Sequence, residues 1–208
     1  MSRDARFAIY FAPRPDSPLA QKAAAWFADP DSQPHTVSPR HYGFHATLKP
    51  PFALNDGQTP DQLRQALQCF AAEQVRLTLP PFTVNLLGNF IALTLSVPSE
   101  PLNALAARCV QDFDYFRRPA VRPEKELSPR QRELLAKWGY PYVLDEWKFH
   151  MTLTSSIPDE NTRKVFLQTL KAHFSEFTPV QLTDLCIFMQ SDPATPFALM
   201  DRFPCLKQ

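Results

Sequence analysis

The first feature along the chain is an alternation of large apolar and other residues over 7–11, which predicts a strand. Its period of two turns Phe7, Ile9 and Phe11 to one face and Tyr10 to the other. Similar alternations or short apolar runs predict further strands. These lie at about 44–49, 75–79, 82–87, 90–97, 148–154, 180–190 and 196–203.

Apolar residues at helical spacing, several times preceded by Ser or Thr and then Pro, predict the helices. These are 17–28, 59–74, 99–116, 128–139 and 158–174. Each half of the chain then holds a histidine-bearing strand, a helix and a hairpin. This repeated order of elements suggests two similar lobes within one domain that covers 1–208.

The histidine-bearing strands carry nearly identical segments. Phe-His-Ala-Thr-Leu occupies 44–48, and Phe-His-Met-Thr-Leu occupies 149–153, so the two histidines are 150 − 45 = 105 residues apart. Among five histidines, chance would produce such a pair in roughly one chain in two thousand, by counting matches to the template. The repeated motif therefore indicates a shared role.

In a strand, a histidine and a threonine two residues apart share a face. In the first motif, Phe44, Ala46 and Leu48 would face the core, which leaves the other face to His45, Thr47 and Lys49. In the second motif, Phe149, Met151 and Leu153 would be internal, opposite Lys148, His150, Thr152 and Thr154. Each outward face then presents a proton carrier, a hydroxyl group and a cation.

Those groups suit a phosphodiester. Imidazole titrates near pH 6.5, so His45 and His150 can serve as one general base and one general acid. The hydroxyls of Thr47 and Thr152 and the ammonium groups of the lysines could hold phosphoryl oxygens. The candidates are thus two catalytic histidines and five substrate-binding residues. The latter are Thr47, Thr152, Lys49, Lys148 and Tyr10.

Composition narrows the class of protein. The 208 residues are 44% hydrophobic, with 17 Phe, and their formal net charge is only +1, which argues against a long nucleic-acid track. Four dispersed cysteines without C-x-x-C spacing favour free thiols in the cytoplasm, and neither a metal nor a cofactor is expected. The 208-residue sequence contains no apolar run long enough for a membrane span. We also expect a monomer.

The paired motifs resemble the two-histidine (2H) phosphoesterase superfamily, whose signature is two H-x-[Thr/Ser]-hydrophobic motifs. YGFHATLKPPF at 42–52, LSPRQRELLAKWGYPYVLDEWKFHMTLT at 127–154 and the opening FAIYFAP are similar to the DUF1045, phosphonate-metabolism branch. The resemblance implies an α+β, bilobal, LigT-like fold: two antiparallel sheets flanked by helices around a central cleft. It also implies hydrolysis of a cyclic phosphate on a small ribose phosphate.

Two other functions stay open. An RNA-end 2′,3′-cyclic phosphodiesterase or 2′-5′ RNA ligase would need a basic track with stacking aromatic residues, and a non-catalytic nucleotide-binding module would not need two proton carriers. The substrate would be a small phosphorylated sugar or nucleotide, with RNA less favoured. The basic, Pro-rich segment 117–130 is either a solvated charge run or a flap over a second phosphate.

Overall fold

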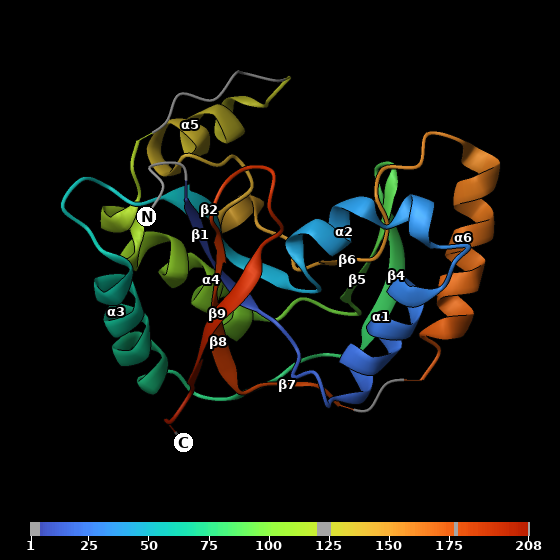
Figure 1. The fold of residues 1–208 in the computed structure, drawn as a ribbon, viewed down its shortest axis with the longest axis horizontal. Coiled ribbons are helices and arrows are strands. Elements are labelled where there is room, and N and C mark those ends of the chain that lie inside the picture. The colour runs from blue at the N-terminus through green and yellow to red at the C-terminus, as the bar shows by residue number, and fades with distance from the viewer. Residues whose placement is uncertain (1–4, 120–125, 177–178, 208) are drawn as a thin grey trace.

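The computed structural model describes residues 5–119, 126–176 and 179–207 and has the α+β organisation expected from the sequence (Figure 1). Two antiparallel sheets form within these residues: seven strands in the order β4-β5-β6-β2-β1-β8-β9, and the pair β3-β7. The strands are β1 (Arg6–Phe11), β2 (Ala46–Ala53), β3 (Leu77–Thr78), β4 (Phe82–Leu87), β5 (Phe90–Leu95), β6 (Met151–Thr152), β7 (Gln181–Leu182), β8 (Asp184–Gln190) and β9 (Ala198–Pro204).

Most helices begin where an N-cap side chain and a proline predict them. Ser17, Thr59 and Ser128 each accept a hydrogen bond from the helix backbone, and the last two form capping boxes. Gly139 ends its helix in the left-handed conformation, φ 72°. The α-helices are α1 (Pro18–Ala28), α2 (Val37–Tyr42), α3 (Pro60–Ala72), α4 (Glu100–Asp112), α5 (Pro129–Trp138) and α6 (Glu160–His173).

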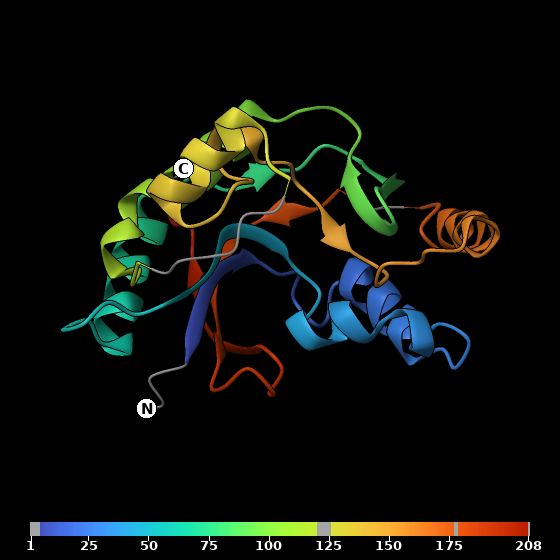
Figure 2. The same cartoon turned by 90° about the horizontal axis from the view of Figure 1, so that it is seen from above.

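The large sheet has two parts that meet at the histidine strands. One part is β4-β5-β6 and the other is β2-β1-β8-β9, and the register between β2 and β6 contains the single pair Ala46–Met151. Figure 2 shows the helices in two groups, α3, α4 and α5 beside the second part and α1 and α6 beside the first. The two lobes therefore share one continuous sheet.

The two halves of the chain, which repeat the same order of elements, do not correspond to the two lobes. The first motif, on β2, is followed by α3 and the β4–β5 hairpin; the second, on β6, is followed by α6 and the β8–β9 hairpin. Yet β4–β5 pairs with β6, and β8 pairs with β1 beside β2, so each half gives its hairpin to the other half's lobe. α3 then packs against β8 and β9, and α6 against β4 and β5. This exchange holds the two histidine strands together.

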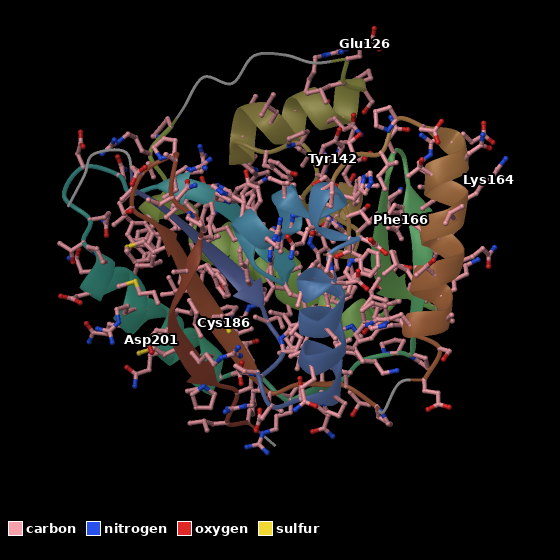
Figure 3. All side chains as sticks on the ribbon, turned by 45° about the vertical axis from the view of Figure 1, so that its right-hand side comes forward. Glu126, Tyr142, Lys164, Phe166, Cys186 and Asp201 are labelled. Carbon is pink, nitrogen blue, oxygen red and sulfur yellow. The ribbon has the colours of Figure 1, made fainter. Side chains whose placement is uncertain are left out.

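The core lies between the sheet and these helices. The inward residues of both motifs, Ala46, Leu48, Met151 and Leu153, are fully buried, and the parity predicted for them is confirmed. Figure 3 shows Lys164 on the outer side of α6 and Phe166 on the side that faces the sheet. The Phe166 ring packs against Trp26 of α1 in a T-shaped contact, so α1 and α6 cover the first part of the sheet together.

Several predicted elements have different bounds. The helix expected over 99–116 ends at Asp112, and a 3-10 turn, Asp114–Phe116, follows it. The second histidine strand has only two paired residues, and α2 was absent from the sequence prediction because its apolar spacing is weak. Of the segment 117–130, residues 120–125 lie outside the described residues. No helix in the described ranges combines the length and apolarity that a bilayer span requires.

Candidate functional site

The two histidine motifs meet in one pocket of about 250 Å³. Its wall is formed by both histidine strands, by β1, by α2 and by the loop after α5. The lining includes Arg6, Tyr10, Ser38, Tyr42, His45, Thr47, Tyr140, His150 and Thr152. The convergence of the two histidines, predicted from their shared motif, is therefore present in the fold. No Asp, Glu or Cys is among the lining residues described.

His45 is held by its own backbone. Its Nδ1 lies 2.9 Å from the carbonyl oxygen of Gly43, and its Nε2 lies 3.2 Å from Oγ1 of Thr47. A carbonyl oxygen only accepts hydrogen bonds, so Nδ1 carries a proton and Nε2 of the neutral ring accepts the hydrogen bond of the Thr47 hydroxyl. Gly43 adopts φ 78°, which glycine tolerates, and a Cβ there would lie 3.1 Å from the Phe188 ring. The turn that presents this carbonyl is thus specified by a glycine.

His150 is held in the same way. Its Nδ1 lies 2.9 Å from the carbonyl oxygen of Lys148, again two residues earlier. The same argument assigns the proton to Nδ1 and leaves Nε2 of the neutral ring as the acceptor. Two rings from distant parts of the chain therefore have the same tautomer within one pocket.

Burial lowers the pKa of the His45 ring. The pKa of His45 is lowered to about 4, chiefly because burial desolvates the charged ring; the hydrogen bond to the Gly43 carbonyl opposes this effect, and electrostatic repulsion from His150 adds a smaller lowering. His45 is therefore neutral at physiological pH, with Nε2 unprotonated. That is the state a general base needs.

The Tyr10 side chain lies on the face of β1 that points away from the main core, as expected. It is buried, and its ring stacks on His45 with centroids 3.6 Å apart and planes 16° apart. Burial, together with the neighbouring Tyr42, raises the pKa of the Tyr10 hydroxyl well above its ordinary value. The group therefore remains a protonated hydroxyl that can donate a hydrogen bond to a ligand.

The two motif threonines line the pocket, but the next threonine does not. Thr47 and Thr152 are partly exposed there, close to the histidines of their own motifs. Thr154, which shares their strand parity, is fully buried, and its Oγ1 accepts a hydrogen bond from the backbone N–H of Ile91 at 2.9 Å. Thr154 therefore secures the end of the strand instead of facing a ligand.

The parity predicted for Lys49 is wrong. β2 has two more residues than β1 over the paired stretch, so Thr47 lies opposite Tyr10 but Lys49 lies opposite Ile9, on the core side. There the Lys49 ammonium group donates to the Val110 carbonyl oxygen at 3.0 Å. The bulges in β2 thus turn this lysine away from the catalytic pocket.

Lys49 forms an ion pair with Asp114 on the core side of the sheet. The Lys49 ammonium lies 3.4 Å from a carboxylate oxygen of Asp114. The pKa of Lys49 is lowered to about 8, because the effect of burial exceeds the opposing effect of Asp114. Burial works to raise the pKa of Asp114, but its bonds to Arg117 and Lys49 outweigh that effect and lower it. Lys49 is thus a structural cation.

Lys148 contributes to the site through its backbone carbonyl group and not through its side-chain ammonium group. Its carbonyl oxygen orients His150, while its side chain is exposed and borders a different hollow, beside Trp147 and Phe149. The expected alternation of burial holds from Lys148 to Leu153, but the chain enters β6 only at Met151, so the Lys148 side chain lies outside the paired strand. Lys148 is therefore not brought to the pocket.

Sequence reasoning missed the cation and two of the aromatic residues that do line the pocket. Arg6 at the start of β1 supplies the guanidinium group, and Tyr42 and Tyr140 add aromatic faces. A signal existed for Arg6, since it has the same strand parity as Tyr10 four residues later. Tyr42 and Tyr140 lie in or beside helices whose placement only the tertiary structure determines.

Comparison with known proteins shows the family of this chain. The family model described as "Protein of unknown function (DUF1045)" matches residues 47–198. A ribose 1,5-bisphosphate phosphokinase PhnN of Janthinobacterium sp. (strain Marseille) is 33% identical over 96% of this chain and 50% of its own length. Its namesake in Laribacter hongkongensis (strain HLHK9) is 31% identical over 93% and 50%. The chain spans about half the length of these curated relatives.

Solved structures resemble the fold at low sequence identity. E. coli LigT in apo form has a TM-score of 0.51 at 14% identity, covering 98% of this chain and 99% of its own. E. coli LigT complexed with 3′-AMP has a TM-score of 0.50 at 14% identity, covering 97% and 98%. The chain therefore belongs to the DUF1045 family and has a LigT-like fold.

Proposed function

We propose that this protein hydrolyses a cyclic phosphodiester on a small ribose phosphate, without a metal ion. One observation carries the proposal: two histidines with the same Nδ1-protonated tautomer line a single pocket beside two threonine hydroxyls. A pocket with two imidazoles and no described carboxylate or thiolate suits proton transfer better than the binding of a hard divalent cation.

The reaction needs one proton taken and one proton given. Nε2 of His45 accepts a proton from water as the water oxygen attacks phosphorus, and the bond from phosphorus to one ribose oxygen breaks. Nε2 of His150, in its protonated form, donates a proton to that departing oxygen. The Thr47 hydroxyl, which turns from Nε2 of His45 to the substrate, and the Thr152 hydroxyl donate hydrogen bonds to the non-bridging oxygens, where negative charge increases. Proton exchange with solvent then restores both histidines.

The role assigned to His45 follows from its lowered pKa of about 4, which keeps it unprotonated before the reaction. A general acid must start protonated, so that role falls to His150. His45 also stacks on Tyr10, which fixes the ring plane. The second motif threonine, Thr152, binds a phosphoryl oxygen from the β6 side of the pocket.

The names of the curated relatives support a particular ribose substrate. This sequence lacks the G-x-x-x-x-G-K motif by which many kinases hold phosphates, and it matches only half of each relative. We assign the named kinase activity to the other half. That activity uses ribose 1,5-bisphosphate, which forms when water opens a phosphate bridging O1 and O2 of ribose 5-phosphate at O2. The two halves would then catalyse consecutive steps, in keeping with a place in phosphonate breakdown.

A nucleotide or RNA end is the second candidate. Tyr42 and Tyr140 offer aromatic faces at the pocket, and Tyr42 already stacks on Phe197 with centroids 5.3 Å apart. A base could stack there while its 2′,3′-cyclic phosphate lies between the histidines. The same catalytic groups would serve this substrate.

A substrate screen tests the proposal. The purified protein is incubated with ribose 5-phosphate 1,2-cyclic phosphate, with nucleoside 2′,3′-cyclic phosphates and with short RNAs that end in a cyclic phosphate. Turnover should be highest on the ribose compound and persist in a chelator. His45→Ala and His150→Ala should each lose about 10²–10⁴-fold in kcat. His173→Ala, outside the pocket, should retain activity.

Each other result has a definite meaning. Preference for the nucleoside or RNA compounds would support the second candidate. Activity abolished by the chelator and restored by a divalent metal would disprove the metal-free mechanism. Binding of these compounds without hydrolysis of any of them would identify a non-catalytic module.

A further inference from the structure

A second pocket lies next to the catalytic one. It has a volume of about 140 Å³ and shares Arg6 and Pro51 with the catalytic pocket. Its other cationic lining residues are Lys49, Arg117 and Arg118, and no described lining residue is acidic. None of the proposed catalytic groups lies in this second pocket.

The pocket occupies the part of the β2 edge that β6 does not cover. β2 pairs with β6 only at Ala46, and near its other end the backbone of Leu54 forms a bridge with Arg117. The Arg118 N–H also donates to the Ala53 carbonyl oxygen at 2.8 Å. The chain after α4 thus returns to β2 and places two consecutive arginines beside the uncovered edge.

The end of α5 completes the wall. Gly139 packs so closely that a Cβ there would lie 2.9 Å from Nη1 of Arg117. Arg117 is also fixed by Asp114, at 2.7 and 3.0 Å, and by the Lys137 carbonyl oxygen at 3.0 Å. Its position is therefore set before any ligand binds, which reduces the entropy lost on binding.

The charges of this region do not cancel. Among the described residues, four cations, Arg6, Lys49, Arg117 and Arg118, face two acids, Asp114 and Asp56, which gives 4 − 2 = +2. In the catalytic pocket, only Arg6 of these cations is present. Much of the local positive charge is therefore displaced from the histidines toward the second pocket.

Arg6 connects the two pockets. Its Nε donates to Oε1 of Gln190 at 2.7 Å, an uncharged partner, so the guanidinium charge is not neutralised by this bond. Arg6 and Tyr10 share a face of β1 and are four residues apart, about 13 Å between Cα atoms at strand spacing. The long Arg6 side chain can cover part of that interval.

We propose that the second pocket binds a further phosphate group of the substrate, distinct from the one that reacts between the histidines. The inference rests on the proposed function and specifies its substrate class: a sugar phosphate with two separate phosphoryl groups. The reacting phosphate lies between His45 and His150, and the other is bound by Arg6 and Arg118, in the field of the Lys49–Asp114–Arg117 cluster.

Product binding tests the subsite without depending on turnover. Calorimetry compares ribose 1,5-bisphosphate, the product proposed above, with ribose 1-phosphate. The second phosphate adds charge-assisted hydrogen bonds, so the bisphosphate should bind the wild-type protein at least about tenfold more tightly. Arg118→Gln should remove most of that advantage, and Arg118→Lys should retain part of it.

A matched control addresses the loss of a surface charge itself. Arg64→Gln removes another partly exposed arginine that is paired with acids, on α3, and should leave the advantage unchanged. Equal affinity of the wild-type protein for the two compounds would overturn the subsite, as would an advantage that persists in Arg118→Gln. The substrate screen tests hydrolysis separately, so the subsite and the proposed function can fail independently.

Discussion

The ring of Tyr10 lies flat against the ring of His45, with centroids 3.6 Å apart and planes 16° apart. The pair joins β1 to β2 on the pocket side of the sheet, where Tyr10 is opposite Thr47. Together with the Nδ1 bond to Gly43, the stack leaves His45 little freedom to rotate. The geometry that makes Nε2 available thus depends on a residue outside both motifs.

Substitution of Tyr10 separates its ring from its hydroxyl group. Tyr10→Phe keeps the stack, so kcat should stay within about threefold of wild type, and any rise in KM measures the hydroxyl's contact with substrate. Tyr10→Leu removes the stack, and kcat should fall by about tenfold or more because His45 is less well oriented. Steady-state kinetics of both variants, with circular dichroism to verify folding, test this. Equal kcat in the two variants would contradict a positioning role.

The pH dependence of kcat/KM should reveal the lowered pKa of His45. The proposed base is active only when neutral, so activity should be maintained down to about pH 4 and fall tenfold per pH unit below it. Initial rates between pH 3 and 8 test this, with each sample returned to neutral pH to exclude irreversible loss. A decline that starts near pH 6.5 would contradict the assignment of His45 as base.

The same shift links stability to pH. The pKa of His45 is lowered in the folded state, so the unfolded chain takes up the proton first as pH falls. Stability is therefore lost between about pH 6.5 and 4, by up to about 3 kcal/mol from this group. His45→Gln should show a correspondingly smaller drop in unfolding free energy between pH 7 and 4. Urea titrations at both pH values measure the difference, and identical drops would disprove the linkage.

Thr152 and Thr154 should respond in opposite ways to the same change. Thr152→Val removes a hydroxyl from the pocket and should lower kcat by about tenfold with little change in stability. Thr154→Val leaves the buried Ile91 N–H without its acceptor and should cost about 1–3 kcal/mol of stability while kcat is retained. Kinetics and chemical denaturation of both variants provide the comparison. A loss of kcat in Thr154→Val alone would reverse our assignment of the two residues.

The Lys49–Asp114 pair should behave as a buried structural ion pair. Asp114→Ala leaves the Lys49 ammonium buried without its carboxylate and should destabilise the fold by about 3 kcal/mol. Lys49→Met preserves the packing of the side chain and should cost no more than about 1 kcal/mol. The double variant should be more stable than Asp114→Ala alone. Additive losses in this double-mutant cycle would show that the two groups do not interact.

The sequence by itself determined the histidine motifs, the inward residues of each motif and most helix starts, because strand parity and N-capping depend on neighbours along the chain. It also indicated the family and the α+β class. The convergence of His45 and His150 was predicted from the repetition of the motif, and the pocket they share confirms it. Their identical tautomers follow from a local contact, a carbonyl two residues earlier.

Only the tertiary structure decided which cation each pocket receives. Lys49 has the parity of Thr47 in a regular strand, but the bulges in β2 arise from its pairing with β1, which local sequence does not encode. Arg6, Tyr42 and Tyr140 reach the pocket because β1 pairs with β2 and because α2 and α5 pack beside them. The acidity of His45 likewise depends on burial by neighbours distant in sequence. Local patterns fix the faces of an element, whereas its partners, its irregularities and its electrostatic environment arise from packing.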